Sequence, residues 1–150
     1  MDIDKEIYNR AIDLLARREE SRKTLMLKLM KRNYEILNIE PILDKLEDKG
    51  YLNNRRYAEE WVRTRLIKTA EAPNVLISSL VVRGISEAIA REVVNDAVNA
   101  IGYEVLLEKA AKKVLKKSTI TKDKFIAALV RKGFSLSSIK SYIYELNLFC

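Results

Sequence analysis

Apolar residues recur along this chain at steps of three and four, the spacing of one face of an α-helix. The first such set consists of Ile3, Ile7, Ala11, Leu14 and Leu15. Residues 3–18 are therefore expected to form an amphipathic helix. Only four Gly and two Pro interrupt the pattern, too few for the hairpin turns of a sheet protein. We predict an all-α fold.

Turn and capping residues divide the first third of the chain into three predicted helices. Ser21 offers a hydroxyl cap to a second helix, which should end near Asn33. A third helix is expected from Asn38, with Pro41 in its first turn, where no hydrogen bond is lost. Gly50 should stop it.

The same order of features returns twice in the rest of the chain. In the middle third we expect a helix from an Asn53 or Asn54 cap through Leu66, and then a helix that carries Val75 to Val81 and is ended by Gly84. A further helix should be capped by Ser86 and carry Val98. In the last third we expect helices over 105–115, 121–131 and 137–148.

The second helices of the three sets have similar sequences: TLMLKLMKRN, NVLISSLVVRG and KFIAALVRKG. Leu29, Leu80 and Leu129 follow one another at 51 and then 49 residues, a period at the upper end of helical repeats. We predict an elongated array of three tandem three-helix repeats, 1–52, 53–102 and 103–150. The alternative is a chance likeness of amphipathic helices in one globule.

Composition argues for binding rather than catalysis. The chain has no His, its one cysteine is Cys150, and its four glycines are isolated from one another. A histidine-based active site, a paired-cysteine metal site and a Gly-rich nucleotide loop are all missing from the sequence. We expect no enzyme activity, no cofactor and no metal. Without an apolar leader or a membrane-length apolar run, a cytoplasmic protein is expected.

Positive charge is concentrated in the last third. The net charge is +7, and residues 103–150 hold ten Lys or Arg against four Asp or Glu. This excess favours contact with a polyanion such as nucleic acid, or with an acidic protein surface. The alternative is a lysine-rich helix that is merely solvated.

The strongest candidates for phosphate contact lie on one predicted helix and at the end of the next. They are Lys112, Lys113, Lys116 and Lys117, joined by Arg131 and Lys132. Almost no acidic residue is expected near the four lysines. Contacts of this kind are independent of base sequence and sensitive to salt.

Three segments in this order, AIDLLARREES, GYLNNRRYAEEWVRTR and VVRGISEAIA, resemble the RecX family of bacterial recombination regulators. The resemblance covers nearly the whole chain. It implies an all-helical modulator that binds the RecA nucleoprotein filament and restrains its strand-exchange, ATPase and coprotease activities. It also favours Arg56 and Arg63 as partner-binding residues, whereas binding and internal ion pairing are equally weighted for Arg55 and Arg65.

The chain departs from the family pattern at two places. Asn54 stands where relatives usually carry an acidic residue, which keeps a capping side chain without its charge. The segment from Ala70 to Pro73 replaces a glycine-rich turn, which should stiffen the link between helices. Neither change removes a catalytic group.

Two residue pairs near these segments have simpler interpretations. Tyr57 and Trp61 are one turn apart and could stack on exposed bases, but packing between repeats is favoured. Arg17 and Arg18 precede Glu19 and Glu20, which should neutralise them locally.

The leading hypothesis is a monomeric regulator of RecA that acts along the filament or at its ends. The alternative is a helical protein that binds single- or double-stranded DNA directly through phosphates, independent of sequence. No membrane partner is expected.

Overall fold

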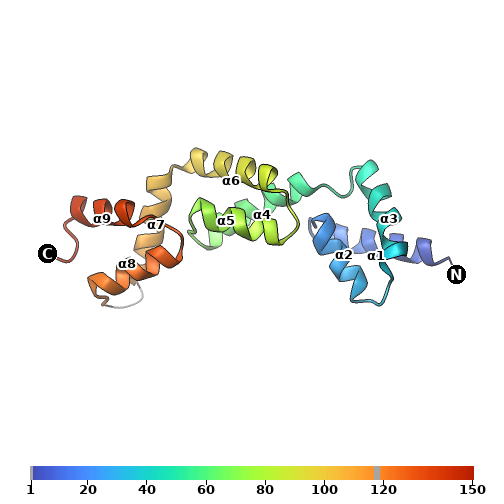
Figure 1. The fold of residues 1–150 in the computed structure, drawn as a ribbon, viewed down its shortest axis with the longest axis horizontal. Helices are drawn as coiled ribbons and strands as arrows, with labels where there is room; N and C mark the ends of the chain where they lie inside the picture. The colour runs from blue at the N-terminus through green and yellow to red at the C-terminus, as the bar shows by residue number, and fades with distance from the viewer. Residues whose placement is uncertain (1, 117–118) are drawn as a thin grey trace. The chain divides into compact units, whose positions relative to one another are not determined.

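The computed structural model describes residues 2–116 and 119–150, which fold into helices joined by short turns (Figure 1). The helices are α1 (Ile3–Arg17), α2 (Arg22–Met30), α3 (Ile36–Asp48), α4 (Asn54–Lys68), α5 (Pro73–Val82), α6 (Glu87–Ile101), α7 (Tyr103–Lys116), α8 (Lys122–Arg131) and α9 (Leu136–Glu145). The described ranges contain no β-strand, so the predicted all-α fold is confirmed. No described helix is long and apolar enough to cross a membrane.

Predicted capping residues begin several helices. The Ser21 hydroxyl accepts the Thr24 N–H (3.0 Å), and the Thr24 hydroxyl accepts the Ser21 N–H (2.9 Å), which completes a capping box at α2. Asn53 rather than Asn54 caps α4, because its side-chain oxygen accepts a backbone N–H of the first turn (2.8 Å). The predicted Ser86 cap of α6 is confirmed. Thr121, expected as the first residue of its helix, is instead the N-cap of α8.

The predicted start of the third helix at Asn38 is wrong by two residues. α3 begins at Ile36, after a Glu35 side chain that makes no capping hydrogen bond, so the sequence carries no polar signal for this start. Pro41 therefore lies in the second turn, where its missing N–H leaves the Leu37 carbonyl without its helical donor.

The chain divides into two compact units. Unit 1 comprises Met1–Trp61 and Leu80–Ala90, and unit 2 comprises Val62–Ser79 and Arg91–Cys150. The division falls within α4, α5 and α6, and so does not follow the borders of the predicted repeats. The three-repeat organisation remains a prediction.

The core of unit 1 is an apolar cluster to which α1, α2 and α3 all contribute, each packing against the other two. Its members are Ile7, Ala11, Leu25, Leu29, Ile39, Ile42, Leu43, Leu46 and Leu52, none more than 4% exposed. Each large aliphatic side chain buried in this way contributes about 1.5–3 kcal/mol. The amphipathic stripes predicted from the sequence therefore meet in one small core.

Buried positions recur at the spacing on which the repeat prediction depends. Six sets of three residues follow one another at 51 and then 49 residues, and no member is more than 7% exposed. The sets are Ile7, Ala58 and Leu107; Ala11, Val62 and Ala111; Leu25, Leu76 and Phe125; Leu29, Leu80 and Leu129; Ile39, Ala90 and Ile139; and Leu43, Val94 and Ile143. These matched positions are compatible with the three repeats, which stay a prediction.

A left-handed residue follows the second helix of each predicted repeat. These residues are Asn33 (φ 70°), Gly84 (φ 92°) and Gly133 (φ 94°). The next residues in the last two cases, Ile85 and Phe134, are buried, and their N–H groups bond back to the carbonyls of Leu80 (3.1 Å) and Leu129 (3.2 Å). This arrangement ends the helix and returns an apolar side chain to the core.

The turn after α5 packs against the start of α2 within unit 1. The Ser21 hydroxyl donates to the Arg83 carbonyl (2.6 Å), and the Lys23 ammonium donates to the Val82 carbonyl (2.9 Å). A Cβ added at Gly84 would lie 2.4 Å from the Cβ of Lys23. Carbonyls that α5 leaves without helical partners are therefore satisfied by side chains around the first turn of α2.

A comparable contact joins two turns of unit 2. The Ala72 N–H donates to the Lys132 carbonyl (2.9 Å), and a Cβ added at Gly133 would lie 2.5 Å from a methyl of Val75. Ala70 and Ala72 are buried. The Cβ of Ala72 lies 3.2 Å from the same added Cβ, so this methyl group helps to fill the contact.

The variants Gly84→Ala and Gly50→Ala form a matched pair in unit 1. Both glycines have positive φ, 92° and 77°, so alanine meets a similar left-handed penalty, roughly 1–2 kcal/mol, at either position. A Cβ at Gly50 has no atom within 4 Å, whereas one at Gly84 clashes with α2. We expect Gly84→Ala to lower the free energy of unfolding by at least about 1 kcal/mol more. Urea denaturation followed by circular dichroism measures the difference, and equal losses would contradict this packing.

Candidate polyanion-binding surface

Two lysines of α7 bond to the end of α4 in unit 2. Lys109 donates to the Leu66 carbonyl (2.7 Å), and Lys113 donates to the Lys68 carbonyl (2.8 Å). Both carbonyls belong to the last turn of α4, where no helical N–H is available to them. The negative end of the helix dipole also favours ammonium groups at this place. Part of the lysine charge of α7 therefore serves to hold two helices together.

The pKa of Lys113 is lowered from its ordinary value. Burial is the largest cause, and the charges of Lys109 and Lys132 add to it. The charges of Lys109 and Lys132 thus disfavour the charged form of Lys113.

The remaining lysines of α7 differ in their surroundings. Lys112 pairs with Glu108 one turn earlier (3.2 Å), so the expectation that almost no acidic residue lies near these lysines is wrong. The pair is exposed on both sides and contributes little stability. Lys116 is exposed at the last residue of α7. Lys117 lies outside the described residues.

The end of α8 supplies the other two predicted residues. Arg131 is the exposed last residue of α8, and the partly buried Lys132 follows it. The effect of Lys132 on the pKa of Lys113 places it near the lysines of α7. We define the α7 lysine surface, which includes the end of α8, as Lys109, Lys112, Lys113, Lys116, Arg131 and Lys132.

Lys109 was not among the residues selected from the sequence. It lies one turn before Lys113 on the same helix, and Glu108 beside it suggests a neutralised position. In the structure Glu108 pairs with Lys112 instead. The signal that could have identified Lys109 is its spacing of four residues from Lys113.

Arg56 is engaged by the turn that precedes its own helix. Its Nε donates to Glu19 (2.7 Å), and its two Nη atoms donate to the carbonyls of Gly50 (3.0 Å) and Tyr51 (3.1 Å). These carbonyls follow the end of α3. The guanidinium therefore joins the α3–α4 turn to the segment before α2. These bonds explain an arginine at this position even if it contacts no other protein.

The rest of the predicted joint also serves packing. Tyr57 is buried, and burial raises the pKa of its phenol, with the charge of Arg83 opposing and that of Glu20 adding to the shift. The Arg83 guanidinium lies over the Trp61 ring at 4.9 Å from its centroid. The interpretation of Tyr57 as a packed residue is confirmed. Arg63 is exposed on α4 and interacts with a neighbouring group.

No protein-family model matches the chain. Among curated proteins, it is 28% identical to the regulatory protein RecX of Listeria monocytogenes serotype 4a (strain HCC23) over 152 residues, 96% of this chain and 55% of that protein. The chain thus spans about half the length of its Listeria relatives. It is 32% identical to the regulatory protein RecX of Chlorobium phaeobacteroides (strain BS1) over 146 residues, 95% of each.

Comparison with solved structures also finds RecX proteins. The crystal structure of RecX from Lactobacillus salivarius superposes on this chain with a TM-score of 0.75, at 28% identity and 97% coverage of both chains. A second crystal structure of a regulatory protein RecX has a TM-score of 0.74 at 24% identity and supports the fold alone. With a relative above 30% identity matched along nearly its whole length, this chain belongs to the RecX family of regulatory proteins.

Proposed function

We propose that this protein binds the RecA nucleoprotein filament and restrains its strand-exchange, ATPase and coprotease activities. The proposal depends on one observation, the similarity to RecX proteins over 95% of both this chain and its Chlorobium relative. The relatives are named as regulatory proteins. We therefore assign the chain a binding role rather than a catalytic one.

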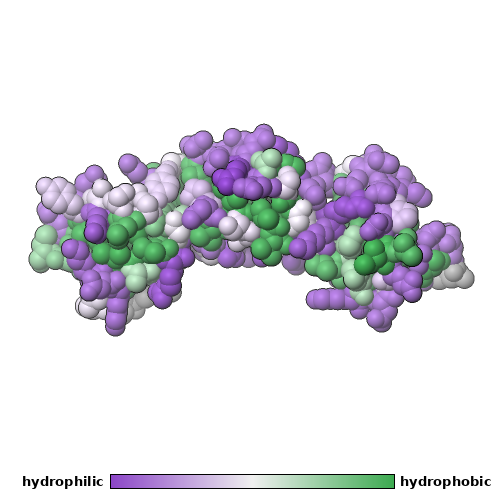
Figure 2. Space-filling model, viewed as in Figure 1, coloured by the Kyte–Doolittle hydropathy of each residue, from purple (hydrophilic) through white to green (hydrophobic). Residues whose placement is uncertain are grey.

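Exposed apolar side chains favour a protein partner. Leu37 and Tyr144 are 82% and 83% exposed, and Ile67 and Val82 are 70% and 68% exposed. Figure 2 shows hydrophobic surface (green) between hydrophilic areas (purple) on the visible face of the molecule. Protein interfaces combine buried apolar contacts with a polar rim, whereas a nucleic-acid backbone needs little beyond cations.

Addition of the protein should lower the steady-state ATPase of RecA on single-stranded DNA. The physical reason is that a bound regulator must favour a less active filament or prevent its growth. A titration of the regulator against fixed RecA, followed by phosphate release, measures the effect. Inhibition far below one regulator per RecA would indicate action at filament ends, and inhibition only near equal amounts would indicate binding along the filament. An unchanged rate at equimolar, folded protein would overturn the proposal.

Direct DNA binding is the second candidate function, and the α7 lysine surface favours it. The specific observation is a group of three exposed cations on α7 and at the end of α8, namely Lys112, Lys116 and Arg131. Lys113 and Lys109 already bond helix carbonyls. The groups left for phosphate contact are then Lys112, Lys116 and Arg131, all exposed in unit 2.

The triple variant Lys112→Gln, Lys116→Gln, Arg131→Gln tests this second function. If each residue contacts one phosphate, the slope of log affinity for single-stranded DNA against log salt should become shallower by about 2. Fluorescence anisotropy of a labelled oligonucleotide at four salt concentrations gives the slope. The control Lys122→Gln, Lys124→Gln, Lys140→Gln removes equal charge from exposed residues of α8 and α9. An equal change of slope in both variants would mean that net charge alone determines the salt dependence, and would contradict a binding site at these three residues.

A further inference from the structure

A pocket of about 520 Å³ opens in unit 1 where α1 ends beside α2. Five of its lining residues are cationic: Arg17, Arg18, Lys28, Lys31 and Arg32. The other two are Leu14 and Glu20. We call it the α1–α2 pocket, and none of its residues belongs to the α7 lysine surface.

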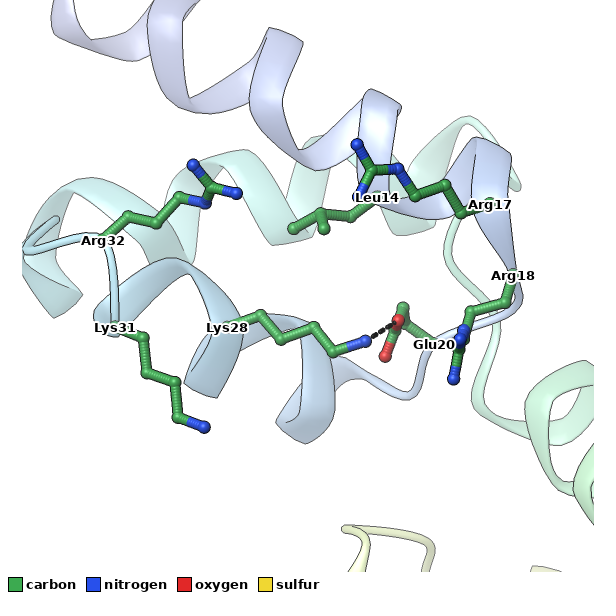
Figure 3. A pocket seen from close by; sticks show the side chains of 7 residues that line it. All are labelled: Leu14, Arg17, Arg18, Glu20, Lys28, Lys31 and Arg32. Carbon is green, nitrogen blue, oxygen red and sulfur yellow. Dashed lines mark hydrogen bonds and ion pairs between the residues drawn. The ribbon is translucent and has the colours of Figure 1, made fainter.

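Local structure brings these cations together. α1 ends at Arg17, and Arg18 follows in an extended conformation (φ −166°, ψ 160°). Lys28, Lys31 and Arg32 are three and four residues apart, so their Cα atoms share one side of α2 and the turn after it. Figure 3 shows the Arg17 and Arg32 guanidinium groups reaching toward Leu14 from opposite sides, while Lys31 points away.

The two acidic residues that follow Arg18 pair with cations other than Arg17 and Arg18. Glu19 pairs with Arg56 (2.7 Å). Glu20, 3% exposed, accepts from Thr24 (2.8 Å) and pairs with Lys28 (2.5 Å). The sequence-based expectation that Glu19 and Glu20 neutralise Arg17 and Arg18 is therefore wrong.

The pocket consequently carries an uncompensated positive charge. Its five cations are opposed by the single carboxylate of Glu20. Within the described part of the chain, no ion pair is formed by Arg17, Arg18, Lys31 or Arg32. Unit 1 gains this local field although residues 1–54 hold equal numbers of acidic and basic side chains.

We propose that the α1–α2 pocket binds a run of adjacent phosphate groups. Guanidinium forks match phosphate oxygens bidentately, and lysines add further charge. The volume lies in the range of small-ligand sites and exceeds the need of a single phosphate. No aromatic residue lines it, so stacking on bases is not part of the contact. The run of phosphates is that of a single-stranded nucleic acid backbone or of a free polyphosphate such as a nucleoside triphosphate.

Glu20 lowers the affinity of this site for phosphate. Its buried carboxylate forms an ion pair with the Lys28 ammonium inside the pocket (Figure 3). A bound phosphate must share Lys28 with Glu20 and lies within the field of that carboxylate. The site goes beyond RecA binding and requires no filament.

The triple variant Arg17→Gln, Arg18→Gln, Arg32→Gln tests the pocket on the full chain. Its affinity for a fluorescent oligo(dT) should depend less on salt, with a slope shallower by about 2, because about 0.7 counterions are released per phosphate contact of a single strand. The control Lys5→Gln, Arg10→Gln, Lys45→Gln removes equal charge from unit 1 outside the pocket. Both variants are first confirmed as folded by circular dichroism. Equal slopes in variant and control, together with equal affinity of both for inorganic tripolyphosphate, would overturn the proposal, whatever the effect on RecA.

Competition distinguishes the source of the phosphates. Inorganic tripolyphosphate that displaces oligo(dT) from the wild type, but not from the pocket variant, would support a site for free polyphosphate. Displacement only at concentrations that act equally on both proteins would support the nucleic-acid backbone. Poly-glutamate that competes as well as oligo(dT) per charge would overturn the preference for phosphate and indicate an acidic protein partner.

Glu20→Gln provides a test in the opposite direction. The amide can still accept the Thr24 hydroxyl, but it removes the only carboxylate of the pocket and releases Lys28. Affinity for oligo(dT) at low salt should rise roughly fourfold, the effect of one charge about 5 Å away in water. The control Asp48→Asn changes net charge identically at an exposed residue of α3 outside the pocket and should have a smaller effect. An equal gain in both variants would contradict the role of Glu20.

Discussion

Short helices leave many backbone carbonyls without partners, and the fold depends on side chains from other helices to satisfy them. In unit 1, Ser21 and Lys23 bond the carbonyls at the end of α5, and Arg56 bonds those after α3. In unit 2, Lys109 and Lys113 do the same for α4. The bonds to the Arg83 and Leu66 carbonyls are partly buried, where a carbonyl left without a donor costs roughly 1–3 kcal/mol. The other bonds are exposed to solvent and contribute less.

This requirement divides the basic residues into two groups. One group bonds helix ends and is occupied by the fold, as Lys113 and Arg56 are. The other group is gathered by the fold but has no acidic partner, as Arg17 and Arg32 are in the α1–α2 pocket. The distinction does not follow net charge. The first 54 residues are balanced in charge, yet they contain the more concentrated positive pocket.

Periodicity in the sequence was sufficient to predict the helices, because apolar stripes and capping hydroxyl or amide groups act locally. It failed at α3, whose Glu35 start has no capping bond. The bond of Lys113 to the Lys68 carbonyl joins residues that are 45 positions apart in the sequence. No local sequence pattern predicts such bonds. The pocket was missed for the same reason, since Arg17 and Arg32 come together only when α1 packs on α2. Glu108 was overlooked although it stands four residues before Lys112.

The three bonds of Arg56 bear on how abundant this protein is in the cell. Its guanidinium connects Glu19 to the two carbonyls that follow α3. A substitution there removes three exposed hydrogen bonds that connect two turns, which lowers the free energy of unfolding and raises the fraction of unfolded chains that proteases can remove. An arginine retained at this position among relatives would then be maintained by folding. Weaker regulation in such a mutant would reflect fewer molecules rather than poorer recognition.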